Sequence, residues 1–314
     1  MLIKNSLRLL INNLTIVFKV MVTSLVVLLF SYLLATSFFS DVIKKVSQND
    51  EFKTLMSKVG DIWSAFISAD FRPQIDLIES FEAFMEAIRL NIGNYYLQLI
   101  GLFVGFYLIS VLSNLCVYTL TYIMNARMSS YEKKGFLASF ILTLKKSLPF
   151  EAWYSLLSLL VFCLSAFVTI LFVVYTFSRI YFLSIVIGLW LGISVYSLYD
   201  TMTAMFRPLS VNDEKFKSLF KNRYAKYDFA QVFASFLFAI ISFTVINVMT
   251  FITTLGAGLV ISIPITQVFF SVLRLVLYYS SEGKRYYLDY ETIETPNKIK
   301  SDATSADFLD NIEM

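Results

Sequence analysis

Long runs without charge dominate the pattern of hydrophobic and polar positions along this chain. Residues 95–124 contain no charged side chain, and a helix needs only about 20 apolar residues to cross a bilayer. Residues 229–273 are also uncharged, which is too long for one span, and the glycine-bearing stretch 253–258 is the natural break between two. The pattern predicts an all-α, polytopic membrane protein with six transmembrane helices, at about residues 20–39, 95–124, 152–176, 180–199, 229–252 and 257–280.

Amphipathic stretches separate these spans. In residues 2–18, 136–148 and 216–227 apolar side chains recur every three or four positions, as on one face of a helix. Each stretch precedes the first helix of a pair, so the chain is predicted as three hairpins, each preceded by an amphipathic segment. Two more amphipathic helices are predicted within residues 41–94, and their apolar faces must be buried against each other, the membrane or the bundle.

The distribution of basic residues predicts the orientation. If the chain crosses the membrane at these six spans, 19 of the 26 Lys and Arg residues lie on the same side of it, in residues 1–19, 125–151, 206–228 and 274–314. Because positively charged loops stay in the cytoplasm, both termini and the amphipathic segments are predicted to be cytoplasmic. The helical loop 41–94 is then external. The predicted membrane domain covers residues 1–280, and a polar cytoplasmic tail covers residues 281–314.

Composition excludes several kinds of chemistry. The chain has no histidine, which rules out a Ser-His-Asp triad and a histidine-ligated metal, and it has no phosphate-binding glycine loop or HExxH sequence. Cys116 and Cys163 both lie in apolar runs, so we expect buried thiols. We therefore expect a non-enzymatic protein without a cofactor or metal. The orientation of the spans already explains why the loops are basic, so these loops do not indicate nucleic-acid binding. The expected partner is the lipid bilayer and not nucleic acid.

Glycine is concentrated in the spans that return toward the cytoplasm. The outward spans contain none, whereas the returning spans contain Gly101 and Gly105, Gly188 and Gly192, and Gly256 and Gly258. The first two pairs have the Gly-x-x-x-Gly spacing that lets helices approach closely. The hypothesis is that the returning helices pack together centrally. The alternative is chance, because glycine is common in membrane helices.

Few ionisable residues enter the predicted spans, and such residues are candidates for function. Asp200, near the end of the fourth span, and Arg274, inside the end of the sixth, have compatible depths for an intramembrane ion pair. Such a pair would either serve function or lock two helices together. Four uncharged polar residues would line a cavity or form hydrogen bonds between helices: Gln98, Asn114, Asn247 and Gln267.

Two junctions between hairpins have a distinctive composition. Lys145-Lys146 follows a Phe-rich stretch before one hairpin, and Phe206-Arg207-Pro208 and Phe220-Lys221-Asn222 precede the next. Over residues 139–240 this layout resembles the YesL-like family of small bacterial membrane proteins. Arg207 and the loop 41–94 depart from the family pattern. The resemblance implies a bacterial cytoplasmic membrane and a link to transport, because family members often accompany carbohydrate uptake systems.

The leading interpretation is a transport-associated subunit or a small permease, acting with a transport complex or another membrane protein. The alternative is a membrane-organising or regulatory protein that binds lipid or a partner through its interfacial helices and external loop. A permease predicts a water-accessible cavity lined by the polar residues named above. An organising protein predicts solid packing there and an apolar surface on loop 41–94 that faces a partner.

Overall fold

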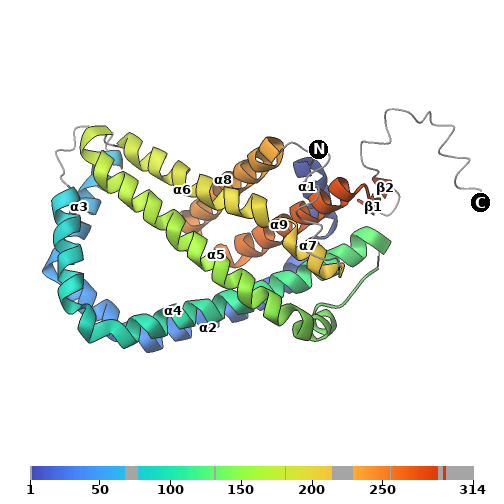
Figure 1. The fold of residues 1–314 in the computed structure, drawn as a ribbon, viewed down its shortest axis with the longest axis horizontal. Helices are drawn as coiled ribbons and strands as arrows, with labels where there is room; N and C mark the ends of the chain where they lie inside the picture. The colour runs from blue at the N-terminus through green and yellow to red at the C-terminus, as the bar shows by residue number, and fades with distance from the viewer. Residues whose placement is uncertain are drawn as a thin grey trace, which may run out of the picture. The chain divides into compact units, whose positions relative to one another are not determined.

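The computed structural model describes residues 2–67, 77–130, 132–180, 182–213, 229–254, 256–288 and 293–294 (Figure 1). The described chain is almost entirely helical. Its helices are α1 (Leu2–Asn12), α2 (Leu14–Gln48), α3 (Asp50–Ile67), α4 (Leu77–Ser130), α5 (Phe136–Ile180), α6 (Phe182–Thr203), α7 (Phe206–Val211), α8 (Phe229–Thr254) and α9 (Leu259–Glu282). A short antiparallel ladder follows, in which β1 (Tyr286–Tyr287) pairs with β2 (Ile293–Glu294).

The described helices are those of a membrane protein. Five stretches are long and apolar enough to cross a bilayer, and the bent pair formed by α1 and the start of α2 adds a sixth if it counts as one span. The backbone of α2 is helical throughout the predicted first span. The prediction of an all-α polytopic membrane protein is therefore confirmed.

The helices are longer than the predicted spans. Helix α4 joins part of the predicted external loop to the second span in one helix of 54 residues, which is roughly 80 Å at 1.5 Å per residue. Helix α5 joins the amphipathic segment 136–148 to the third span and contains Pro149, which had been expected to end that segment. Both helices exceed the ~30 Å hydrocarbon thickness of a bilayer.

The chain divides into two compact units. Unit 1 contains Met1–Leu25, Ser113–Glu151 and Ser197–Met314, and unit 2 contains Val26–Leu112 and Ala152–Tyr196. This division does not follow the predicted boundary at residue 280, because α4, α5 and α6 each contribute to both units. The two units are described separately below.

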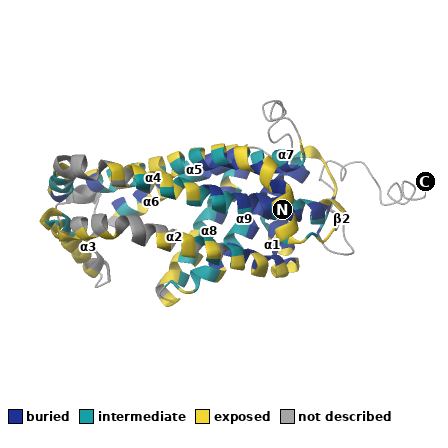
Figure 2. Cartoon of the chain, turned by 90° about the horizontal axis from the view of Figure 1, so that it is seen from below, coloured by how far each residue is buried: buried dark blue, intermediate teal, exposed yellow. Residues whose placement is uncertain are grey.

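Helix α9 is the core of unit 1. All ten residues from position 271 to position 280 are buried, so the helix is covered on every side there (Figure 2). Leu9 of α1, Met124 of α4 and Phe236 of α8 belong to the same hydrophobic cluster. Such burial needs a helix that is apolar all round, and α9 is close to that pattern. The sixth predicted span is thus a central packing element.

Helix α1 is attached to the chain that follows α9. Its Asn5 Nδ2 donates to the Tyr286 hydroxyl at 2.9 Å, and its Asn12 Nδ2 donates to the Leu288 carbonyl at 3.2 Å. Helix α9 ends at Glu282, and the next residue, Gly283, has a φ of +73°, the left-handed conformation that glycine adopts at helix ends. The N-terminal helix and the C-terminal ladder therefore lie together beyond the end of the last span.

Unit 2 contains two helix contacts that side chains define. The Phe52 ring of α3 lies 5.5 Å from the Phe84 ring of α4, centroid to centroid. Helices α5 and α6 are joined by hydroxyl groups, because Ser165 Oγ donates to the Gly192 carbonyl at 2.6 Å and Thr169 Oγ1 donates to the Gly188 carbonyl at 3.1 Å. These bonds run between two membrane-spanning helices that follow each other in the chain.

Candidate functional site

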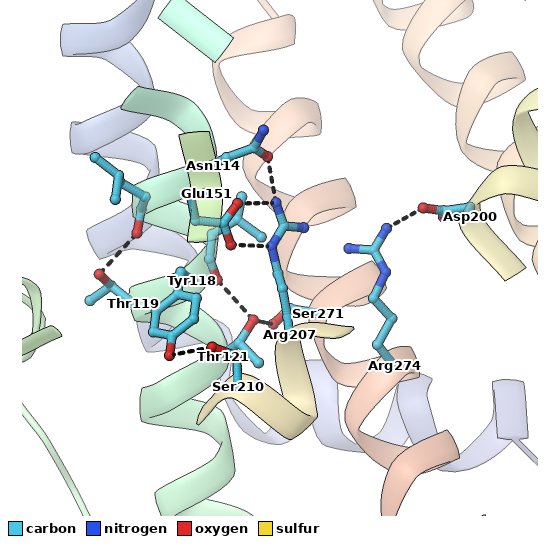
Figure 3. A network of polar contacts seen from close by, with 12 residues as sticks. Asn114, Tyr118, Thr119, Thr121, Glu151, Asp200, Arg207, Ser210, Ser271 and Arg274 are labelled. Atoms are coloured by element: carbon cyan, nitrogen blue, oxygen red, sulfur yellow. Dashed lines mark hydrogen bonds and ion pairs between the residues drawn. The ribbon is translucent and has the colours of Figure 1, made fainter. Parts of the chain in front are cut away.

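A buried ion pair joins α5 to α7 in unit 1. Arg207 Nε donates to Glu151 Oε1 at 2.7 Å, and Arg207 Nη2 donates to Glu151 Oε2 at 3.0 Å (Figure 3). The same Nη2 also donates to Asn114 Oδ1 of α4 at 2.5 Å. Glu151 has no exposed surface and Arg207 is only 3% exposed. Bidentate pairing of this kind is the strongest geometry available to a guanidinium and a carboxylate.

The local sequence explains why Arg207 is inside. Helix α7 has only six residues, and Pro208, Leu209 and Val211 around Arg207 are all buried. Burial of these apolar side chains draws α7 against the helices and brings the guanidinium with it. Helix α7 is also bonded to α4, since Tyr118 and Ser210 share a hydroxyl hydrogen bond of 3.1 Å.

A second ion pair joins α6 to α9. Arg274 Nη2 donates to Asp200 Oδ1, and both side chains are almost fully buried (Figure 3). Arg274 also interacts electrostatically with Glu151, which connects the two pairs. We call Asn114, Glu151, Asp200, Arg207 and Arg274 together the charged site. It contains two carboxylates and two guanidinium groups, so its formal charges balance.

Hydroxyl groups extend the polar contacts around the charged site. Thr121 of α4 shares a hydrogen bond of 2.9 Å with Ser271 of α9, and Thr119 shares one of 3.3 Å with Thr143 of α5. Removing charges from water costs several kcal/mol per ion. Balanced charges, bidentate geometry and the added amide contact offset that cost. The arrangement can hold helix ends together, or bind an anion if one pair opens.

The structure brings some of the predicted polar residues together. Asp200 and Arg274 form an ion pair, and Asn114 contacts the neighbouring Arg207. Asn247 instead donates from Nδ2 to Thr266 Oγ1 at 3.3 Å, between α8 and α9. Gln267 lies half-buried in α9, and the side chain of Gln98 lies outside the described residues.

The returning spans are the more buried ones. In the apolar windows of α9, α4 and α6, 56%, 33% and 33% of the residues are buried, against 22% in α8 and 6% in α5. The glycines do not produce this burial in the expected way. Gly101 and Gly105 lie in α4, and a Cβ atom added at Gly105 would meet no described atom within 4 Å.

The other glycines make different contacts from those expected. Gly188 and Gly192 face α5, the outward helix of their own hairpin; a Cβ atom added at Gly188 would lie 2.7 Å from Val173 Cγ2. The Gly-x-x-x-Gly spacing of α6 therefore allows close contact between the two helices of one hairpin. In that contact Ser and Thr hydroxyls of α5 donate hydrogen bonds to the glycine carbonyls. Gly256 and Gly258 lie in the turn before α9 and not in its packed interior. Gly256 has a positive φ in this turn, a conformation that favours glycine.

Sequence reasoning missed Glu151 and Arg207. Both were counted among the charges of the basic cytoplasmic loops, and their burial as a pair was not foreseen. One signal was present: Arg207 is the only charge in residues 201–211, a stretch with an apolar majority. A charge surrounded by apolar residues at the end of a span is a candidate for burial with a partner.

Comparison of the chain with family models, with curated protein sequences and with solved structures finds no match. Among the residues that the structure describes, no group of three or more His, Cys, Asp or Glu side chains could hold a metal ion. The fold and the charged site define the class: an all-α, multi-pass membrane protein whose helices are joined by buried ion pairs.

Proposed function

We propose that this chain is a non-enzymatic integral subunit that binds a partner protein through α3 and the first part of α4; the resemblance over residues 139–240 is what supports a partner belonging to a transport system. The observation that carries the proposal is an exposed apolar surface on α3 and the first part of α4. There Met56, Val59 and Met85 are 49%, 42% and 48% exposed, whereas Phe52 and Phe84 hold the two helices against each other.

The charge of this segment indicates that it lies outside the hydrocarbon layer. Helix α3 contains Asp50, Glu51, Lys53, Lys58 and Asp61. Lipid would accept exposed Met and Val side chains, but it would not accept five charges in eighteen residues. Apolar side chains that face water next to a membrane mark a surface for a partner protein. Under the positive-inside orientation this surface is on the outer side of a bacterial cytoplasmic membrane, with both termini in the cytoplasm.

The test is purification in a gentle detergent followed by native mass spectrometry. We expect the wild-type chain to carry a second subunit that the double variant M56Q/V59Q loses. The control is S57Q, at an exposed polar position between the two. A partner retained by M56Q/V59Q, or lost equally by S57Q, would contradict the proposal. A partner unrelated to transport would favour the organising or regulatory function instead.

A small permease is the second candidate, and the charged site is the observation that favours it. Ionisable residues inside membrane helices often mark a path for substrate. Cysteine labelling distinguishes the two candidates, after Cys116 and Cys163 have been replaced by serine. A permease requires that a membrane-impermeant thiol reagent reach N114C or N247C, whereas the proposed subunit should be labelled at S57C alone.

A further inference from the structure

Helix α1 has one buried face and one exposed face. Leu2, Leu9 and Leu10 are buried, and the helix packs against α9. On the opposite face Leu7 is 42% and Ile11 63% exposed. A soluble protein would not gain from exposing these side chains, but a helix lying in the membrane interface does.

The geometry of the chain places α1 at a membrane surface. Its axis makes an angle of 77° with the start of α2, the helix that contains the predicted first span. If α2 crosses the bilayer, α1 runs nearly parallel to the membrane plane. Its bonds to Tyr286 and Leu288 connect it to the chain just after α9 ends at Glu282. Both observations put α1 at the level where the last span leaves the bilayer.

A shallow, open groove runs along the exposed face of α1. This hollow, of about 480 Å³, is lined by Ile3, Lys4, Leu7, Arg8, Ile11 and Asn12. Lys4 and Arg8 are four residues apart, so the two cations lie one above the other on the same side of the helix. The hollow therefore presents two positive charges beside a strip of aliphatic side chains.

We propose that this hollow binds an anionic phospholipid. The lipid phosphate contacts Lys4 and Arg8, and an acyl chain lies along Leu7 and Ile11. A soluble anion would use only the cations. A zwitterionic lipid carries the same phosphate but also a choline cation, which Lys4 and Arg8 repel, so an anionic lipid fits the cations and the aliphatic strip better. The lipid would also be continuous with the bilayer that the neighbouring α2 enters. This proposal does not depend on the proposed role in transport.

The test compares lipid retention by native mass spectrometry of the full chain in detergent, with phosphatidylglycerol or phosphatidylcholine added. A basic residue near an anionic membrane surface changes affinity by roughly fivefold, so K4Q/R8Q should weaken phosphatidylglycerol binding by about 30-fold. The control K133Q/K145Q removes two exposed charges from another part of unit 1 and should change binding less than about twofold. Phosphatidylcholine binding should change much less in K4Q/R8Q, because its choline cation already weakens the attraction of its phosphate to Lys4 and Arg8.

Several results would overturn the proposal. One is equal retention of phosphatidylglycerol by K4Q/R8Q and by the wild type, and another is an equal loss in K133Q/K145Q. Displacement of the lipid by millimolar inorganic phosphate would show a site for the free anion. A dimer that K4Q/R8Q dissociates would show that the face binds a second copy of the chain.

Discussion

The charged site predicts a large penalty for removing one member of its bidentate pair. In R207M, the Glu151 carboxylate keeps its burial but loses both guanidinium contacts, and Asn114 loses one hydrogen bond. An uncompensated buried charge destabilises a protein by about 3–5 kcal/mol. We therefore expect R207M to lose roughly 3–5 kcal/mol of the free energy of unfolding, a large share of what most domains possess.

Two further variants separate charge burial from packing. The double variant E151Q/R207M buries no charge, so its loss should be at most about 2 kcal/mol, well below that of R207M alone. Lys146 and Asp213 provide the exposed control, because their 2.5 Å pair lies at side chains that are 40% and 80% exposed. The variant K146Q should lose under about 1 kcal/mol.

The measurement is reversible unfolding in mixed micelles as the denaturing detergent fraction rises. Helix content from circular dichroism and tryptophan fluorescence follow the transition, and Trp153 is an exposed reporter two residues from Glu151. If R207M and K146Q lose similar amounts of the free energy of unfolding, the Glu151–Arg207 pair does not behave as a buried pair. If E151Q/R207M loses the sum of its single variants, the two residues are not coupled.

Three further expectations use the same unfolding measurement. D200N and R274Q should each be destabilised by about 3 kcal/mol, and the double variant should lose well under the sum of the two single losses. Additive losses would exclude direct pairing. G192A should lose about 1–3 kcal/mol because the added methyl group meets α5, whereas G105A should change stability by under about 0.5 kcal/mol; equal losses would contradict the contacts described here. N247A should lose only about 0.6 kcal/mol, the usual size of one hydrogen bond between membrane helices, and a loss above about 2 kcal/mol would point to a larger role.

The helical fold follows from the sequence because a bilayer sets strict requirements. Uncharged runs of about 20 residues have few alternatives to crossing as helices, so the spans can be located from composition alone. The ends of the helices cannot be located in this way. Helix α4 continues through residues 90–100 although Gly93 and Asn94 lie there, and α5 continues through Pro149. The local pattern predicts neither outcome, because glycine and proline are the residues that most often end a helix.

Glycine spacing shows the same limit. Gly101-x-x-x-Gly105 and Gly188-x-x-x-Gly192 are indistinguishable as sequence patterns, yet Gly188 and Gly192 are pressed against a neighbouring helix, whereas Gly105 meets no described atom. What distinguishes them is the partner, because α5 offers Ser165 and Thr169 at the matching depth. The sequence pattern of one helix does not predict which residues of a neighbouring helix pack against it.

Sequence reasoning handled charge unevenly: it paired Asp200 with Arg274 from their matching depths, but it placed Glu151 and Arg207 in loops. The two members of a pair are 74 and 56 residues apart, respectively, so no local window contains either pair, and only a matching depth can suggest one. The Asp200–Arg274 pair ties helices of two different predicted hairpins, and the Glu151–Arg207 pair ties the start of the second hairpin to the segment that leads into the third. Separating the helices that a pair joins would leave a buried charge without its partner. This costs about 3–5 kcal/mol for each pair broken. A permease cycle that opened the charged site would have to supply that energy in every turnover. A subunit that binds a partner through α3 and α4 needs no such opening, and for that subunit the charged site keeps one end of the bundle rigid.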